Sequence, residues 1–135
     1  MGPAKVIVDA SAILAMLLKE PDERTFADFL TETAHELVIS PVNYLEVSLR
    51  VDRGDMPEAS AALDPLINRF GIAIAQIMPE QAKLAREAFQ RYGKGNHPAK
   101  LNLGDCFAYA LSKARNEPLL FKGDDFRQTD VEAAL

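Results

Sequence analysis

Four short apolar runs, which alternate with amphipathic helical patterns, constrain what this chain can fold into. The strand-like runs cover residues 5–9, 37–39, 72–77 and 119–121. Helical patterns fill the intervals at 12–19, 23–33, 41–54, 57–70, from 79 onward and 103–115. Strand and helix signals that alternate in this order predict one α/β domain over residues 1–135. Its expected core is a small, mainly parallel sheet of about four to five strands between helices.

Local patterns also predict how several helices begin and which side chains share a helix face. Ser40 and Asp55 are expected to cap the helices that follow them, because each precedes a proline near the first helical turn. The helix from residue 41 carries Val42, Leu45 and Leu49 on one side, which is its expected apolar face.

Acidic residues recur where the expected strands end or where helices begin. Asp9 ends the first run, Glu46 lies on the helix after Ser40, Asp105 lies in the first turn of the helix at 103–115, and Asp124-Asp125 follow the last run after one glycine. If the runs are parallel strands, these carboxylates gather at one rim of the sheet, where open α/β sheets bind ligands. Close carboxylates repel one another unless a divalent cation neutralises them, which predicts Mg²⁺ or Mn²⁺.

Each of these acids also has a simpler structural explanation. Asp9 could only cap the helix that follows it, and the dipole of its helix could favour Asp105. Glu46 could face solvent, and Asp124-Asp125 could belong to an ordinary turn. Their joint placement favours a shared site, but the spacing leaves open which member of the last pair faces it.

Composition excludes several classes of protein and site. No apolar run approaches the roughly 20 residues of a membrane helix, and no signal peptide is expected from the residues that follow Gly2-Pro3-Ala4. A single cysteine excludes an internal disulfide and fits a reducing cytoplasm. Two histidines, His35 and His97, lack partners at ligand spacing, so we expect surface roles for them and no structural zinc. Cys106 is expected in the core.

The charge of the chain is unevenly distributed. The net charge is −5, yet residues 83–127 hold nine Lys/Arg and five Asp/Glu, which makes that segment +4 and the rest −9. A basic half next to acids and a metal could hold a phosphate backbone, whereas mixed charge on solvated helices is the plainer alternative. The candidate backbone contacts are Arg86, Lys94, Lys100 and Lys122.

The acids lie in four longer segments that together carry a resemblance to a known family. The segments are Val8-Asp9-Ala10-Ser11-Ala12, Asn43-Tyr44-Leu45-Glu46, Leu103-Gly104-Asp105-Cys106-Phe107-Ala108-Tyr109-Ala110 and Leu120-Phe121-Lys122-Gly123-Asp124-Asp125-Phe126, the last followed by Thr129-Asp130. In this order they resemble a PIN domain and, more narrowly, the VapC toxins of bacterial type II toxin–antitoxin pairs. The resemblance covers essentially the whole chain.

The resemblance implies a PIN-like three-layer α/β/α fold and a Mg²⁺- or Mn²⁺-dependent endoribonuclease that arrests growth by cutting RNA. It also implies a homodimer and a VapB-like antitoxin, which would block the active site and supply DNA binding. By position, Asp9, Glu46 and Asp105 would be the core catalytic acids and metal ligands. The fourth acid would be Asp124 or Asp125. Ser11 and Asn43 would be polar supports.

The chemistry expected of such a site is hydrolysis of a phosphodiester by a metal-activated water. A binding module with a PIN-like fold and no turnover is the main alternative, and metal binding would discriminate the two. A receiver-like signalling domain is disfavoured because Asp9 is followed by Ala-Ser rather than a second acid. A metal-dependent phosphatase is disfavoured because no Asp-x-Asp nucleophile pair is present.

Overall fold

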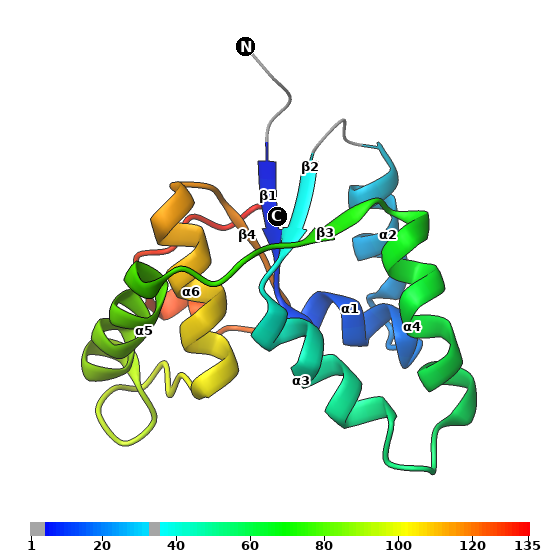
Figure 1. The fold of residues 1–135 in the computed structure, drawn as a ribbon, viewed down its shortest axis with the longest axis horizontal. Helices are drawn as coiled ribbons and strands as arrows, with labels where there is room; N and C mark the ends of the chain where they lie inside the picture. The colour runs from blue at the N-terminus through cyan, green and yellow to red at the C-terminus, as the bar shows by residue number, and fades with distance from the viewer. Residues whose placement is uncertain (1–4, 33–35) are drawn as a thin grey trace.

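The computed structural model describes residues 5–32 and 36–135 and is built around a sheet of four parallel strands (Figure 1). The strands are β1 (Lys5–Val8), β2 (Glu36–Ile39), β3 (Ile72–Ile74) and β4 (Leu119–Leu120), and their spatial order is β3-β2-β1-β4. The expected small parallel sheet is therefore confirmed. The surface role expected for His35 falls outside the described residues.

Six α-helices surround the sheet, one for each predicted helical pattern. They are α1 (Ala10–Leu17), α2 (Glu23–Glu32), α3 (Pro41–Val51), α4 (Pro57–Arg69), α5 (Pro79–Tyr92) and α6 (Leu103–Arg115), and a 3₁₀ turn follows at Phe126–Gln128. Within the described ranges, no helix is both long and apolar enough to cross a membrane.

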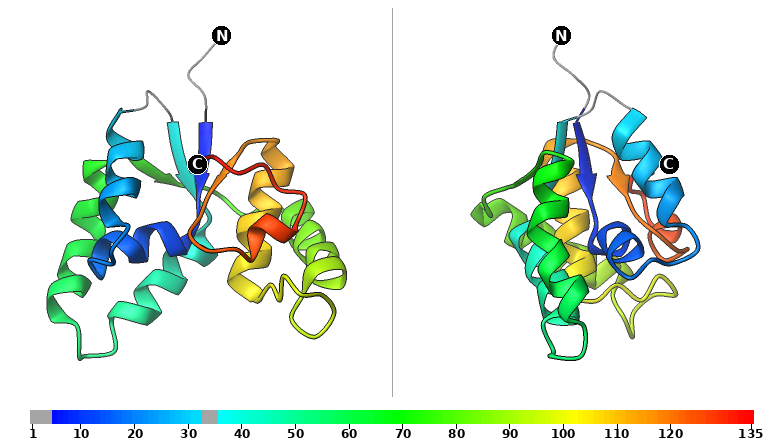
Figure 2. Two further views of the ribbon diagram at one scale, coloured as in Figure 1. Left: turned by 180° about the vertical axis from the view of Figure 1, so that it is seen from behind. Right: turned by 90° about the vertical axis from the view of Figure 1, so that its right-hand side faces the viewer.

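Strands β1, β2 and β4 are buried along most of their length, which is why they read as continuous apolar runs, whereas only Ile72 is buried in the edge strand β3. Val6 and Val8 of β1 pack into the core formed with α1, α2, α3 and α4, whereas Ile7 packs into the second core with α5 and α6. The two groups of helices lie on opposite sides of the sheet (Figures 1 and 2), so the architecture is a three-layer α/β/α sandwich.

The chain reverses direction across the sheet between β1 and β4. Strands β1, β2 and β3 follow one another outward, and the chain then returns to place β4 on the other side of β1. Ile7 pairs with Leu119 and Val8 pairs with Leu120, while the Asp9 amide donates to the Leu120 carbonyl at 2.9 Å. The carboxyl ends of β1 and β4 therefore flank the topological switch point, where α/β sheets bind ligands.

The expectation about the face of α3 was confirmed, and the one about the cap of α4 was wrong. Val42, Leu45 and Leu49 line one groove, but that face is open: Leu45 and Leu49 are 55% and 63% exposed, and the buried residues of α3 are Asn43, Val47 and Val51. Asp55 does not cap α4, which begins after Met56 with no side-chain cap. Ser40 does cap α3 as expected, because its Oγ accepts a hydrogen bond from the Val42 amide at 3.3 Å.

The two side chains expected to have no catalytic role differ in burial. Cys106 is 3% exposed and is confirmed as a core residue, and burial raises the pKa of its thiol to about 11. His97 was expected at the surface but is half-buried. Its Nδ1 accepts a hydrogen bond from the Ala99 amide at 3.0 Å, and its ring meets Tyr92 edge-on. It fastens the loop between α5 and α6.

Candidate active site

Asp9 lies at the switch point and is fixed there by its neighbour Ser11. It is the first residue after β1 and the N-cap of α1, so the simple capping role is part of its function in the fold. Its Oδ2 accepts hydrogen bonds from the Ser11 amide at 3.0 Å and from the Ser11 hydroxyl at 2.6 Å. The Ser11 Oγ in turn accepts a hydrogen bond from the Lys122 amide at 2.9 Å. Ser11 thus joins the end of β1 to the segment after β4.

The other carboxylate oxygen of Asp9 has no hydrogen-bond partner among the described residues. Asp9 is 3% exposed, and its Oδ1 is buried and unsatisfied. Burial, together with the nearby charge of Glu46, raises the pKa of Asp9 to about 6. A buried carboxylate with a free oxygen is costly unless a positive charge or a proton neutralises it.

Glu46 is held against the start of α6 by Asn43. The Asn43 Nδ2 donates to Glu46 Oε1 at 3.3 Å and to the Gly104 carbonyl at 2.9 Å. A Cβ atom built on Gly104 would lie 2.3 Å from Glu46 Oε2, so only a glycine leaves room for this carboxylate. Burial raises the pKa of Glu46, and the charge of Asp105 adds to that effect.

Asp105 completes a reciprocal cap at the start of α6. Its Oδ2 accepts a hydrogen bond from the Asn102 amide at 3.0 Å, and its own amide donates to Asn102 Oδ1 at 2.9 Å. Burial raises the pKa of Asp105 to about 6, and the charges of Asp9 and Asp125 contribute. The carboxylates of α1, α3 and α6 therefore act on one another electrostatically.

Asp124 and Asp125 differ in their burial and in their electrostatic effect on the other acids. Asp125 is half-buried and raises the pKa of Asp105, whereas Asp124 is exposed. The backbone carbonyls of both residues accept hydrogen bonds from the 3₁₀ turn that follows. Asp125 is thus the member of the pair whose charge acts on the other acids.

Three of the acids open into a groove of about 640 Å³ beside α3. Its apolar wall includes the exposed Leu45 and Leu49, and its far end holds Arg50 and Arg53. The sequence-based predictions included neither arginine as a site residue. The spacing of Arg50 four residues after Glu46, on the same face of α3, is the signal that could have found Arg50, whereas Arg53 lies in the loop after α3, where no helix periodicity marks it. The groove is lined by Asp9, Ala10, Ser11, Leu14, Val42, Leu45, Glu46, Leu49, Arg50, Arg53, Asn102, Leu103, Gly104 and Asp105.

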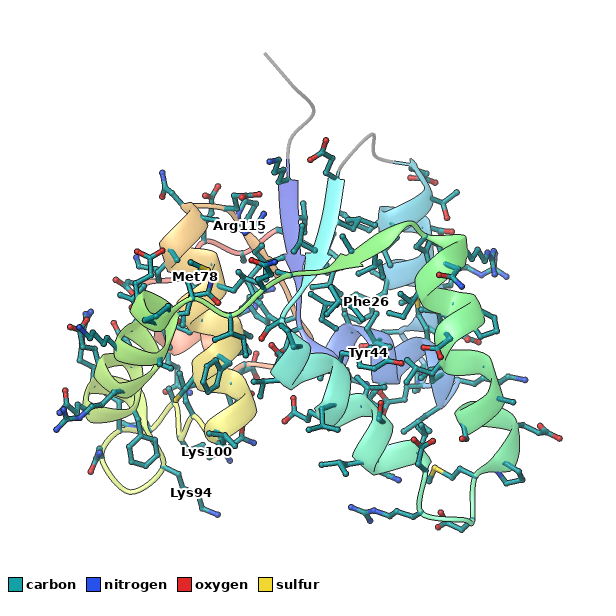
Figure 3. The ribbon with its side chains drawn as sticks, in the orientation of Figure 1. Phe26, Tyr44, Met78, Lys94, Lys100 and Arg115 are labelled. Atoms are coloured by element: carbon teal, nitrogen blue, oxygen red, sulfur yellow. The ribbon has the colours of Figure 1, made fainter. Side chains whose placement is uncertain are left out.

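The four basic residues predicted from sequence do not line this groove. Lys94 and Lys100 belong to the loop between α5 and α6 and are exposed (Figure 3). Arg86 lines a second, apolar hollow with Phe89. Lys122 directs its ammonium group to Glu20 at 3.2 Å and to Asp22 at 3.1 Å, so its charge is already paired.

The oxygen donors at the switch point fit a hard divalent cation. Among the described residues, no three Asp, Glu, His or Cys side chains converge into a ready-made metal cage. Mg²⁺ does not require one, because it keeps several waters and binds through one or two carboxylates. The free Asp9 Oδ1 and the raised pKa values of Asp9, Glu46 and Asp105 mark a place where positive charge is missing.

Comparison with known sequences identifies relatives along nearly the whole chain. The family model described as the PIN domain matches residues 6–132. Ribonuclease VapC42 of Mycobacterium tuberculosis is 40% identical over 130 residues, which are 96% of this chain and 98% of that protein. Ribonuclease VapC28 of the same species is 44% identical over 131 residues, again 96% and 98%.

Solved structures with little sequence similarity share the fold. The crystal structure of M. tuberculosis VapC20, described as a toxin that cleaves the sarcin-ricin loop, has a TM-score of 0.77 at 12% identity and covers 93% of this chain and 95% of its own. The structure of VapBC2 from Rickettsia felis, bound to a fragment of promoter DNA, has a TM-score of 0.74 at 14% identity and covers 96% of both chains.

Proposed function

The chain belongs to the PIN domain family, and we propose that it is a metal-dependent endoribonuclease and the toxin of a VapBC-type toxin–antitoxin pair. Relatives named as VapC ribonucleases support the activity, since they match 96% of the chain at 40% and 44% identity. The observation that carries the proposal is the cluster of mutually repelling carboxylates at the switch point, where Asp9 Oδ1 is free. A cytoplasmic location stays a prediction.

The proposed metal ligands are Asp9, Glu46 and Asp105, with Asp125 favoured over Asp124 as the fourth acid. When bound, Mg²⁺ or Mn²⁺ would supply a water of lowered pKa and a positive charge that offsets the charge developing on phosphate. The protein residues keep the carboxylates in position for it. Since the pKa values of Asp9 and Asp105 are raised to about 6, both would be mostly ionised at neutral pH.

The supporting polar residues have separate tasks in this proposal. Ser11 occupies Asp9 Oδ2 with two hydrogen bonds, which leaves Oδ1 as the oxygen available to a ligand. Asn43 limits the motion of the Glu46 carboxylate by holding one of its oxygens while it is itself anchored to Gly104. The backbone of α6 holds one oxygen of Asp105. Each acid therefore reaches the groove with one oxygen already satisfied.

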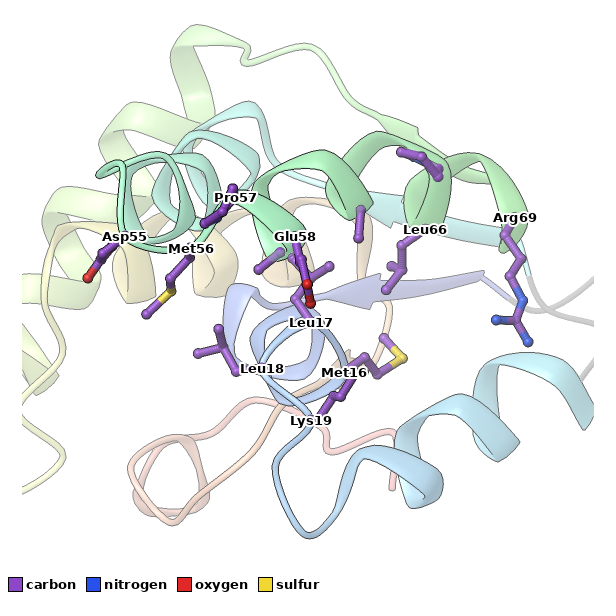
Figure 4. A pocket seen from close by; sticks show the side chains of 13 residues that line it. Met16, Leu17, Leu18, Lys19, Asp55, Met56, Pro57, Glu58, Leu66 and Arg69 are labelled. Atoms are coloured by element: carbon purple, nitrogen blue, oxygen red, sulfur yellow. The ribbon is translucent and has the colours of Figure 1, made fainter.

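A VapB-like antitoxin is the proposed protein partner, and a second groove offers a surface for it. This groove lies between α1 and α4 and measures about 700 Å³ (Figure 4). Leu17, Leu18 and Leu66 are among its apolar lining residues, with Glu58 and Arg69 among its charged ones. An apolar groove flanked by charge suits an amphipathic helix. DNA would be contacted only through the antitoxin, because this chain carries a net charge of −5.

A homodimer is also proposed, with a second copy covering apolar side chains just before α5, on α5 and at the start of α6. Ile77, Met78, Phe89 and Leu103 are 40%, 48%, 43% and 72% exposed. Large apolar side chains grouped at the surface commonly mark protein–protein contacts. The toxin–antitoxin complex would then be a hetero-oligomer built on this pair.

The alternative is a PIN-like binding module without turnover. It is favoured by one observation, namely that no ready-made metal cage exists among the described residues. Cleavage of labelled transfer and ribosomal RNA by antitoxin-free protein discriminates the two, with Mg²⁺, Mn²⁺ or EDTA and beside Asp105→Asn. Discrete cuts that require metal and disappear in the variant are expected. A protein that binds RNA but neither binds metal nor cuts would favour the module.

A further inference from the structure

Two arginines without carboxylate partners lie in the same groove as the acids. Arg50 and Arg53 line the groove together with Asp9, Glu46 and Asp105. Arg50 follows Glu46 by four residues, so both lie on one side of α3, whereas Arg53 lies in the loop just after α3 ends at Val51 and still lines the groove. The groove therefore has an acidic end at the switch point and a basic end at the C-terminus of α3.

The charges of these two arginines are not neutralised within the described part of the chain. None of the ion pairs formed by the described residues includes either one. Arg50 Nη1 makes one contact, to the Met56 sulfur at 3.4 Å, and a thioether is a weak acceptor. By contrast, Lys122, Lys113 and Arg91 all face carboxylates.

We propose that Arg50 and Arg53 bind phosphates of the RNA strand beside the phosphate that is cleaved. The strand would then run along α3, from the acid cluster toward the loop that joins α3 to α4. This inference rests on the proposed nuclease function and adds the path of the substrate to it. It also makes Arg50 and Arg53 the first phosphate contacts. They take the place of the predicted contacts Lys94 and Lys100, which lie outside the groove.

Helix geometry makes this path compatible with an RNA strand. At a rise of about 1.5 Å per residue, Arg50 lies roughly 6 Å along the axis from Glu46, and Arg53 lies in the loop just beyond the end of α3 at Val51. Guanidinium groups bind phosphate oxygens through two parallel hydrogen bonds, which suits them to neighbouring phosphates of one backbone. The exposed Leu45 and Leu49 of the groove wall offer apolar contact to bases or riboses between those phosphates.

RNA is favoured over a peptide as the occupant of this groove because the acids and the arginines would contact one continuous polyanion. A strand bound at a metal by one phosphate needs cations at the next positions, and the groove supplies two of them in one direction. An acidic peptide could pair with the arginines, but it would meet Glu46 and Asp105 at the other end. Loss of antitoxin binding alone is therefore the competing outcome.

The test measures how binding of a short, fluorescein-labelled, mixed-sequence RNA depends on NaCl, in the presence of Ca²⁺ and with gels to confirm that the RNA stays intact. The variants are Arg50→Gln, Arg53→Gln, the double variant and Arg50→Lys. Lys83→Gln is the matched control, because Lys83 is exposed on α5, lies outside the groove and loses the same charge. Circular dichroism checks that each variant folds.

Each lost phosphate contact should lower the slope of log affinity against log salt by about 0.7 for a single strand, so the double variant should lose about 1.4. Binding at low salt should weaken roughly tenfold per arginine, whereas Arg50→Lys and Lys83→Gln should keep the wild-type slope. A wild-type slope in the double variant would overturn the proposed path of the RNA strand. The nuclease proposal would still hold in that case if Asp105→Asn abolishes cutting. A wild-type protein that neither binds nor cuts RNA would overturn both proposals. Loss of antitoxin binding with unchanged RNA binding would assign the arginines to the partner instead.

Discussion

Gly104 and the carboxylate of Glu46 are in direct contact across the boundary between α3 and α6. The space that a Cβ atom of residue 104 would occupy is filled by both Glu46 oxygens, at 2.3 and 2.6 Å. The position of an acid on one helix is therefore set by the absence of a side chain on another.

Gly104→Ala should displace Glu46 and lower cleavage while preserving the fold. A misplacement of about 1 Å at a reacting centre costs on the order of 100-fold in rate, and residue 104 has ordinary helical backbone, so alanine introduces no strain there. RNA cleavage rates measure the effect. Cys106→Ala, on the same helix and away from Glu46, should remain within a few-fold of wild type. Equal losses in both variants would contradict the role of the glycine.

Asp9→Asn should stabilise the metal-free protein, and more so at higher pH. The folded-state pKa of Asp9, about 6, lies above its usual value of 3.8, so the folded state binds more protons between these values and loses stability as pH rises through them. The cost above pH 6 is about 3 kcal/mol, and asparagine does not incur it. Urea unfolding in EDTA at pH 4, 5, 6 and 7.5 should show the variant gaining on wild type across this window. If the difference in free energy of unfolding between the variant and wild type does not change with pH, the raised pKa of Asp9 is refuted.

Mg²⁺ or Mn²⁺ should stabilise wild type at pH 7.5 and stabilise Asp9→Asn much less. A ligand at 100 times its dissociation constant adds about 2.7 kcal/mol to the free energy of unfolding. The gain should be reversed by EDTA and should shrink below pH 6, because protons then compete for Asp9 and Asp105. Thermal melts with and without metal test this. Equal gains in both proteins would place the metal elsewhere.

Asp125→Asn should reduce RNA cleavage by at least about tenfold, whereas Asp124→Asn should change it less than about threefold. The reason is that Asp125 is half-buried and its charge reaches Asp105, while Asp124 is exposed. The two variants have the same charge and adjacent positions, so each controls for the other. The reverse ranking would identify Asp124 as the fourth acid.

Phe89→Glu should convert a dimer to a monomer without loss of fold. Phe89 is 43% exposed on α5, next to the apolar hollow that includes Leu103 and Phe107. A charge placed there would lose its solvation in a dimer and keep it in a monomer. Light scattering measures the mass. The control is Lys83→Glu, on the exposed side of α5. A substitution of another phenylalanine, Phe29, is a poor control because that side chain packs on the core. If the wild-type protein is itself a monomer, the homodimer proposal is wrong.

Much of the fold could be predicted from sequence, because parallel strands buried on both faces give uninterrupted apolar runs. Residues Val6, Ile7 and Val8 form one such run, and their side chains enter both cores in alternation. Acids just after strands or at helix starts, such as Asp9 and Asp105, could be identified from their position alone. Each of these acids can both cap a helix and line the groove, because one carboxylate oxygen accepts the capping hydrogen bonds and the other belongs to the groove.

The remainder depends on contacts between distant segments, which local patterns do not contain. The stripe of Leu45 and Leu49 looks like a buried face, but it lines an open groove, and Asn43 takes the buried position because two helices meet there. The groove arginines were missed because a charge on a helix usually faces solvent. Only the fold shows that Arg50 and Arg53 share a groove with Asp9.

The hydrogen bond from the Lys122 amide to Ser11 joins residues 111 positions apart in the chain. A ribosome synthesises residue 11 well before residue 122, so a nascent chain holds Asp9 long before it holds the β4 segment that completes the switch point. Contacts between such distant residues form late in folding. The order of synthesis therefore leaves the proposed site incomplete in every nascent chain that has not yet gained the segment after β4.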